Sequence, residues 1–176
     1  SFLWVYFGYP VSTYENINAD AARHCAGCLM GKRDNCQADY VAAVPDSGIG
    51  FAIGYSNGSG IPYKRAIIKY TPTWPRSFTP ASQEIRKLVA KMKLIPNKQL
   101  LNNSKVIFCD DSIVRGTTCA RIVKLLRNAG ATEVHLRSSA PPFVNPCYYG
   151  TDIDSKEALI ANNHSIEEIA KIVGVD

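Results

Sequence analysis

The sequence predicts an α/β fold with a central parallel sheet that helices cover on both faces. Short apolar runs alternate with helical patterns along the 176 residues, which is the order typical of strand–helix–strand units. Two of these runs, residues 39–44 and 105–109, are apolar at almost consecutive positions and so predict strands buried on both faces. The length fits one ordinary domain, which can bury a core without disulfides or a structural metal.

The first part of the chain is expected to run strand, helix, strand. The apolar start predicts a short strand over residues 5–7. A helix is expected over residues 18–32, where Asn18 can cap the first turn. The apolar run 39–44 stops at Pro45, as expected of a buried strand that leads into a turn.

The middle of the chain continues this alternation and then interrupts it. Residues 48–55 can form a helix that the Gly-Ser-Gly sequence at 58–60 closes, and residues 66–69 predict the next strand. Three prolines within residues 70–80 prevent a regular helix, so this segment is expected to be a loop. Residues 82–93 then predict an amphipathic, basic helix.

The last part predicts two strands and three helices. The strands are residues 105–109 and 133–138, and a helix over residues 117–128 that ends near Gly130 joins them. Each of the two C-terminal helices begins at a serine that can cap it, and Glu168 completes a capping box in the second. These two helices are expected over residues 155–162 and 165–172, with Ser155 and Ser165 as the caps.

The composition favours a globular protein with an anionic ligand. Hydrophobic residues make up 46% of the chain, charged residues make up 20%, and the net charge is +5. No apolar run approaches the ~20 residues that a membrane helix needs, and no helix-turn-helix pattern or basic tail is present. We therefore expect neither a membrane nor a nucleic acid as partner. The sequence has no signal-peptide pattern, which favours the cytoplasm.

The loop after the strand 105–109 has the chemistry of a phosphate site. Small and hydroxyl residues lead from the strand directly into a helix, so that backbone N–H groups can converge on an anion at the helix N-terminus. Ser112, Thr117 and Thr118 can add hydroxyl donors, and Arg115 can add a positive charge. Because ligands bind at the carboxyl ends of strands in such sheets, this loop is the leading candidate site.

Two adjacent acids, Asp110 and Asp111, open this loop and would repel a phosphate. They are explained if they face the hydroxyl groups of a sugar, or a divalent cation that arrives with the ligand. The alternative is that one of them only caps the following helix, since acids are common at helix starts. The whole loop favours the first explanation.

A second loop at the same edge of the sheet is the sequence Val-Pro-Asp-Ser-Gly over residues 44–48. Taken alone, it is explained as an ordinary turn. Lys69 ends the strand 66–69 at this edge, where its ammonium group could meet phosphate charge; the alternative is a solvated lysine.

The sequence Asp-Asp-Ser-Ile-Val-Arg-Gly-Thr-Thr over residues 110–118 resembles the phosphoribosyl-diphosphate motif of amidophosphoribosyltransferases. The segments Val-Pro-Asp-Ser at 44–47 and Pro-Cys-Tyr-Tyr-Gly-Thr-Asp-Ile at 146–153 are also similar to that family, and the resemblance covers nearly the whole chain. It implies the type I phosphoribosyltransferase fold, in which helices flank a central parallel sheet and a flexible loop closes over the site.

The resemblance also implies which residues bind the ligand. Asp110 and Asp111 would bind the ribose hydroxyls and, together with Ser47, a magnesium ion. The 5′-phosphate would lie in the loop that follows the acids, and the diphosphate against the second loop. The implied substrate-binding residues are Asp46, Ser47, Gly48, Asp110, Asp111, Ser112, Ile113, Val114, Arg115, Gly116, Thr117 and Thr118.

The closing loop is where the chain departs most from the family. The family reads Lys-Asn-Arg-Tyr-Val-Gly-Arg-Thr-Phe, whereas this chain lacks the first arginine and the glycine between Lys69 and Phe78. Carried over by resemblance, Lys69, Arg76 and Lys93 are the catalytic cations that would offset the diphosphate charge. The alternative for Arg76 and Lys93 is an ordinary basic loop and helix face.

The implied reaction displaces pyrophosphate from C1 of ribose with ammonia and gives 5-phosphoribosylamine, a step of purine biosynthesis. Residues 1–176 would be one phosphoribosyltransferase domain of a longer parent, whose N-terminal glutaminase domain supplies ammonia and whose C-terminal tail also lies outside the chain. The expected assembly is a homo-oligomer. The alternative function is a non-catalytic domain that senses phosphoribosyl diphosphate. Transfer to a base or to orotate is disfavoured by the wording of the motif.

The six cysteines are interpreted as reduced thiols. Cys25 and Cys28 form a Cys-x-x-Cys pair, but they lie in a predicted helix without a second pair, so helix packing is favoured over zinc or redox chemistry. By resemblance, Cys147 would be an iron–sulfur ligand only in a full-length parent that carries a [4Fe-4S] cluster. Such a cluster needs four thiolates, so none is expected in this fragment.

Overall fold

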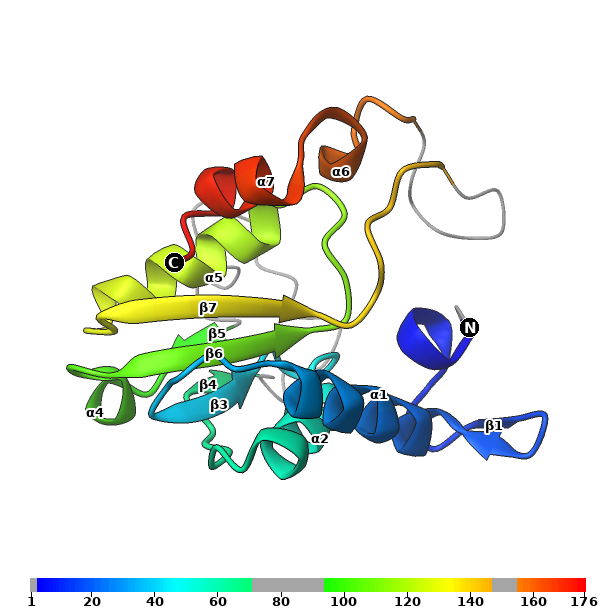
Figure 1. The fold of residues 1–176 in the computed structure, drawn as a ribbon, viewed down its shortest axis with the longest axis horizontal. Coiled ribbons are helices and arrows are strands. Elements are labelled where there is room, and N and C mark those ends of the chain that lie inside the picture. Colours follow the sequence, from blue (N-terminus) through cyan, green and yellow to red (C-terminus); the bar gives the residue numbers. More distant parts are fainter. Residues whose placement is uncertain (1–2, 71–93, 147–154) are drawn as a thin grey trace, which may run out of the picture.

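A computed structural model describes residues 3–70, 94–146 and 155–176 and shows a three-stranded parallel sheet. The sheet contains β3 (Tyr40–Ala43), β6 (Lys105–Asp110) and β7 (Glu133–Ser138), with β6 in the centre. Tyr40 is in register with Val106, and Val106 with Val134. The predicted α/β class and parallel pairing are confirmed, and all three strands end at the same edge (Figure 1).

Helices cover both faces of this sheet (Figure 1). The helices α1 (Ala19–Arg33) and α2 (Ile49–Ser59) pack on one face, and α5 (Thr117–Asn128) and α7 (Ile166–Val173) on the other. Alternate residues of each strand point to opposite faces, and this splits the core into two layers. Val41, Ala43 and Ile107 pack with the α2 residue Phe51, whereas Tyr40, Ala42 and Phe108 pack with the α5 residue Ile122.

The N-terminus contains the clearest difference from the predicted elements. Residues 5–7 are not a strand, because η1 (Leu3–Phe7) is a single π-helical turn in which the Gly8 N–H donates to the Leu3 carbonyl at 2.6 Å. A small antiparallel hairpin follows, made of β1 (Thr13–Tyr14) and β2 (Ile17–Asn18). The predicted cap of α1 is confirmed, since the Asn18 side chain accepts from the Ala21 N–H at 2.9 Å.

The segment after α2 forms a separate two-stranded sheet. The predicted strand at residues 66–69 is present as β4 (Ile67–Lys69), but it pairs antiparallel with β5 (Leu94–Pro96) instead of joining the parallel sheet. Neither β5 nor the short helix α4 (Lys98–Leu101) was predicted. The predicted loop beyond Tyr70 and the predicted helix at residues 82–93 lie outside the described residues.

The C-terminal elements match the prediction except at one helix start. The bounds of α5 and β7 are those predicted, and α7 carries the expected capping box between Ser165 and Glu168. The helix expected to begin at Ser155 instead begins at Ile160, as α6 (Ile160–Asn163). The residues just before α6 form a turn, and Leu159 is fully buried at its N-cap. None of the helices in the described ranges is long and apolar enough to cross a membrane.

Candidate functional site

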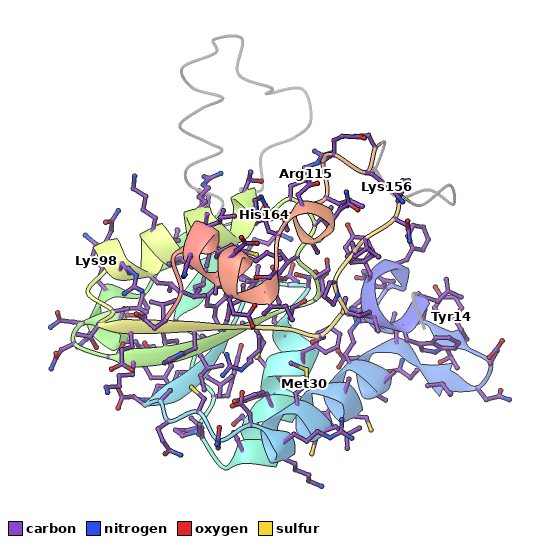
Figure 2. The ribbon with its side chains drawn as sticks, turned by 45° about the horizontal axis from the view of Figure 1, so that its top comes forward. Tyr14, Met30, Lys98, Arg115, Lys156 and His164 are labelled. Carbon is purple, nitrogen blue, oxygen red and sulfur yellow. The ribbon has the colours of Figure 1, made fainter. Side chains whose placement is uncertain are left out.

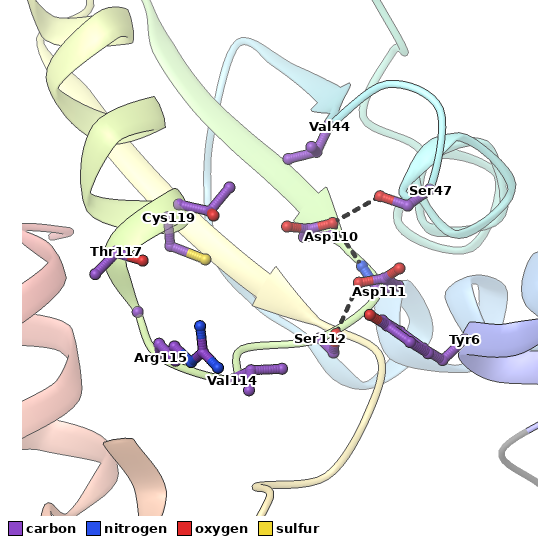
Figure 3. Close-up of a pocket in the computed structure, with 12 residues that line it drawn as sticks. Tyr6, Val44, Ser47, Asp110, Asp111, Ser112, Val114, Arg115, Thr117 and Cys119 are labelled. Atoms are coloured by element: carbon purple, nitrogen blue, oxygen red, sulfur yellow. Dashed lines mark hydrogen bonds between the residues drawn. The ribbon is translucent and has the colours of Figure 1, made fainter. Parts of the chain in front are cut away.

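A cavity of about 410 Å³ opens at the carboxyl edge of the parallel sheet (Figure 3). This is the position at which open α/β sheets bind their ligands. The wall is formed by the ends of β3 and β6, the start of α5 and the N-terminal turn. The lining residues are Tyr6, Val44, Ser47, Asp110, Asp111, Ser112, Val114, Arg115, Gly116, Thr117, Thr118 and Cys119.

The two acids lie in the centre of this cavity and are held by hydrogen bonds (Figure 3). Asp110 is the last residue of β6 and is only 6% exposed. Its Oδ1 accepts from the Ser47 hydroxyl at 3.0 Å and from the Asp111 N–H at 2.9 Å. The Ser112 hydroxyl donates to Asp111 Oδ1 at 2.9 Å. The carboxylates are therefore fixed in position before any ligand binds.

Burial gives these carboxyl groups an unusual affinity for protons. It raises the pKa of Asp110 to about 7, and the nearby negative charge of Asp111 adds to this rise. Burial also raises the pKa of Asp111. Among the described residues, no lysine or arginine forms an ion pair with either acid. A cation that entered the cavity would balance the negative charge of the acids, and a sugar hydroxyl would donate a hydrogen bond to them.

The start of α5 forms the other end of the cavity and has free donors. Helix α5 begins at Thr117, and its first N–H groups have no intrahelical partner. The N-cap residue Gly116 has φ 74°, a left-handed conformation that favours glycine, and a Cβ there would come within 2.7 Å of Ile160 Cδ1. The Ile160 N–H in turn donates to the Val114 carbonyl at 3.0 Å, which ties α6 to this loop. A helix N-terminus of this kind is a suitable position for an anion.

The loop between β3 and α2 lies directly against the end of β6. A Cβ on Gly48 would come within 2.1 Å of the Cys109 carbonyl oxygen, so only glycine allows this contact. This close approach brings Ser47 to Asp110. Asp46 points elsewhere, since its Oδ2 accepts from Lys69 Nζ at 2.8 Å in an exposed ion pair.

The structure brings together most of the predicted site and separates a few residues from it. Eight of the predicted loop and acid residues line the cavity together with Ser47. Figure 2 places Arg115 at the end of the molecule that carries Lys156 and α6, far from Met30 on α1. Four predicted residues are described but do not line the cavity. Asp46 and Lys69 form an ion pair with each other. Gly48 packs against the end of β6, and Ile113 packs against the core cluster that contains the buried residues of α5. Arg76, Lys93 and Cys147 lie outside the described residues.

Three lining residues were not predicted. Val44 and Cys119 extend motifs that were recognised, and their apolar character gave no separate signal. Tyr6 was missed because residues 5–7 were interpreted as a strand of the sheet. A lone tyrosine in an apolar run carries no pattern that could have identified it.

The donor set fits a magnesium ion that is shared with a ligand. Three or more metal-ligating side chains do not cluster anywhere in the described residues. The cavity has two carboxylates with a hydroxyl beside them, and Mg²⁺ is commonly held by one or two carboxylates together with substrate phosphates. Asp110, Asp111 and Ser47 are the residues that would hold it.

The thiols of the described residues differ in burial: Cys25 is exposed, whereas Cys109 and Cys119 are buried. Cys25, Cys28, Cys36, Cys109 and Cys119 are unpaired. Burial raises the pKa of Cys119, the thiol in the cavity wall, to about 12, so it is protonated near neutral pH and is a poor nucleophile. Cys25 and Cys28 lie on α1 as predicted, but Cys25 is exposed and Cys28 only partly buried, so a packing role for this pair stays a prediction.

Known proteins resemble this chain over almost its whole length. It is 46% identical over 175 residues to the amidophosphoribosyltransferase of Methanocaldococcus jannaschii and 44% identical over 173 residues to that of Bacillus subtilis. These alignments cover 99% and 98% of the chain but only 37% and 36% of the relatives, so the chain spans just over a third of their length. No protein-family model matches the chain.

Solved structures give the same result. The glutamine phosphoribosylpyrophosphate amidotransferase of B. subtilis, solved with ADP and GMP, superposes with a TM-score of 0.86 at 43% identity and covers 99% of this chain and 38% of its own. A structure described as the allosteric regulatory enzyme of purine biosynthesis superposes with a TM-score of 0.87 at 43% identity, over 99% of this chain and 37% of its own.

Proposed function

This chain belongs with the amidophosphoribosyltransferases by sequence and has the type I phosphoribosyltransferase fold, and on that premise we propose that it binds phosphoribosyl diphosphate with Mg²⁺ and transfers the phosphoribosyl group to ammonia. One observation carries the proposal. A single cavity holds the acid pair, of which Asp110 is buried and Asp111 partly buried, and the N-terminus of α5, and these are complementary to a sugar and to its phosphate.

The binding roles follow from the chemistry of each wall. The N–H groups at the start of α5, with the hydroxyls of Thr117 and Thr118, would hold the 5′-phosphate. Asp110 and Asp111 would accept hydrogen bonds from the ribose hydroxyls. A bound Mg²⁺ would neutralise charge on the diphosphate leaving group. Ser47 fixes the orientation of the Asp110 carboxylate through its hydrogen bond.

In the proposed reaction the ammonia nitrogen forms a bond to C1 of the ribose while the bond from C1 to the diphosphate oxygen breaks. Pyrophosphate leaves with the bonding electrons, ammonia loses a proton, and 5-phosphoribosylamine is formed. We assign no covalent nucleophile to this step, and the thiol of Cys119 in the cavity wall is protonated near neutral pH. The contribution of the cavity residues is to orient the sugar and exclude competing geometries.

Ammonia is the proposed direct donor. In a full-length protein we propose that a glutaminase domain supplies it, because the matched relatives are amidophosphoribosyltransferases more than twice as long as this chain. Arg76 and Lys93 remain candidates for the cations that meet the diphosphate, and Lys69 joins them if ligand binding displaces Asp46 from its exposed ion pair.

The test is pyrophosphate release by the 176-residue chain with either ammonium chloride or glutamine as donor. We expect slow turnover with ammonium and none with glutamine. An Arg76→Ala variant should lose rate more than affinity, by about a hundredfold if Arg76 positions the leaving group. Tight binding without any pyrophosphate release would contradict the enzyme and favour the sensing function. Equal rates with both donors would contradict the role given to a separate glutaminase domain.

A further inference from the structure

The N-terminal turn contributes one side chain to the cavity from outside the sheet. Tyr6, in the middle of η1, lines the wall beside Asp111 and Ser112 (Figure 3). The start of α5, with Thr117 and Cys119, lies on the other side of the acid pair in the same view. The cavity therefore has three parts: the start of α5, where we propose that the phosphate binds, the acid pair in the centre, and the N-terminal turn, which contributes Tyr6.

A buried cation holds this turn in place. Arg23, on α1, is 5% exposed, and its guanidinium donates to backbone carbonyls of the N-terminal segment. Nε donates to the Trp4 carbonyl at 2.8 Å, and one Nη donates to the Gly8 carbonyl at 2.6 Å and to the Tyr6 carbonyl at 3.4 Å. The three carbonyls flank and include Tyr6. A buried charge is costly unless it is hydrogen-bonded, so these contacts fix the turn against α1.

The hairpin supports the same turn from its other side. The Trp4 Nε1–H donates to the Ile17 carbonyl at 3.1 Å, and the Trp4 ring packs edge-on against Tyr14 with 6.3 Å between centroids. The turn, α1 and the hairpin thus form one connected unit.

We propose that Tyr6 contacts the sugar of the bound ligand and that Arg23 is the positioning residue that sets Tyr6 against Asp111. This rests on the proposed function above. With the phosphate at the start of α5 and the sugar hydroxyls on the acids, the sugar lies between α5 and η1. A tyrosine suits that place, because its ring can pack on the apolar face of a sugar while its hydroxyl hydrogen-bonds to the polar edge.

The first experiment separates the sugar from the phosphate by using two small ligands. Affinities for ribose 5-phosphate and for inorganic phosphate are measured by calorimetry in wild type, Tyr6→Ala, Tyr6→Phe and Phe7→Ala. Phe7 is the matched control, because it is an aromatic residue of the same turn, is 59% exposed and does not belong to the cavity wall. Tyr6→Ala should weaken ribose 5-phosphate about tenfold and Tyr6→Phe about threefold, whereas phosphate affinity stays unchanged.

Equal ribose 5-phosphate affinity in wild type and Tyr6→Ala would overturn the proposal. An equal loss for both ligands would also overturn it, since it would mean a general disturbance of the site. The proposed function fails in a different way, when the wild type itself binds neither phosphoribosyl diphosphate nor ribose 5-phosphate.

The second experiment tests whether Arg23 acts through Tyr6. Arg23→Met should weaken ribose 5-phosphate about as much as Tyr6→Ala, and the double variant should be no weaker than either single variant, because the two residues support one contact. Arg23→Lys keeps the charge but not the fork of donors, so it should fall between wild type and Arg23→Met. Additive losses would show that Arg23 has a separate role and would remove it as the positioning residue. If Arg23→Met does not fold, the same comparison is made with Arg23→Lys.

Discussion

Asp34 is a partly buried carboxyl group and Asp110 a buried one, and their surroundings are opposite. Asp34 follows α1 and forms an ion pair with Arg137 Nε, while the Tyr55 hydroxyl donates to it at 2.8 Å. The Arg137 hydrogen bond lowers the pKa of Asp34 to about 2. Asp110 has hydroxyl and N–H donors but no cationic partner among the described residues, and burial raises its pKa to about 7.

The difference separates an acid whose charge the fold balances from an acid to which we assign a binding role. The charge of Asp34 is balanced inside the protein, where it joins α1, α2 and β7. Asp110 has no cationic partner among the described residues, so its charge is removed by a proton or balanced by a cation that enters the cavity. A buried acid that the fold leaves uncompensated is a marker of a binding site, and its position beside the start of α5 indicates what kind of ligand compensates it.

The largest effect is expected when Asp34 loses its partner. Arg137→Met should lower the free energy of unfolding by about 3 kcal/mol, because it leaves Asp34 partly buried without a cation. Ligand affinity should hardly change. Urea denaturation measures the first effect and calorimetry the second. Lys105→Met is the control, because the pair between Lys105 and Glu133 is exposed and screened by solvent, so its loss should change stability far less.

The acids of the cavity should show the reverse behaviour. Asp110→Asn and Asp111→Asn should each weaken phosphoribosyl diphosphate about a hundredfold, or about 2.7 kcal/mol, while the fold is retained. The new amide oxygen at position 110 can still accept from Ser47 and from the backbone N–H. If calorimetry shows full binding in both variants, or if they unfold, the acids have a structural role and the comparison with Asp34 fails.

The two acids should make the free energy of unfolding depend on pH in opposite directions. The folded protein keeps a proton on Asp110 up to about pH 7, whereas the unfolded chain releases it near 3.8, so Asp110 makes stability fall as pH rises through this window. Asp110→Asn removes that fall and should be more stable than wild type at pH 8 by about 2 kcal/mol. Asp34 acts oppositely, since its stabilisation is lost as pH falls from about 4 towards 2. Thermal unfolding across pH measures both, and a destabilised Asp110→Asn at pH 8 would refute the difference.

The smallest effect compares one hydroxyl at each acid. Ser47→Ala removes a donor to Asp110, and Tyr55→Phe removes a donor to Asp34. Each hydrogen bond should be worth about 1 kcal/mol. We expect Ser47→Ala to weaken ligand binding about fivefold and Tyr55→Phe to lower stability by about that energy without a change in binding. If Ser47→Ala lowered only stability and Tyr55→Phe weakened ligand binding, the roles given to Asp110 and Asp34 would be wrong.

Local patterns predicted the parts of the fold that depend on local chemistry. The bounds of α5 and β7 and the capping box of α7 follow from periodicity and from capping residues, and the structure has them as predicted. The N-terminal turn does not follow from its own sequence, because Arg23, fifteen or more residues away along the chain, holds its carbonyls. Its apolar residues therefore looked like a strand.

The residues of the site also differ in whether a local sequence pattern could predict them. The acid pair and the loop up to Thr118 are contiguous in sequence, so one motif contained them, and the cavity confirms that they lie together. Ser47 joins them because Gly48 allows a close approach to β6. The exclusion of Lys69 from the cavity wall could not be predicted, since β4 pairs with β5 in a separate sheet and its lysine meets Asp46. The roles of the individual residues stay predictions.

The most direct test of the account is a calorimetric titration of the protein with phosphoribosyl diphosphate, once with Mg²⁺ and once with EDTA. The account predicts binding with Mg²⁺ and a loss of at least about tenfold in affinity with EDTA, because the acid pair and the diphosphate of the ligand are both negative and Mg²⁺ would balance their charge. In Asp110→Asn the difference between the two conditions should shrink. No binding at millimolar ligand, or equal affinity with Mg²⁺ and with EDTA, would contradict the claim that this uncompensated acid pair is the centre of a phosphoribosyl-diphosphate site.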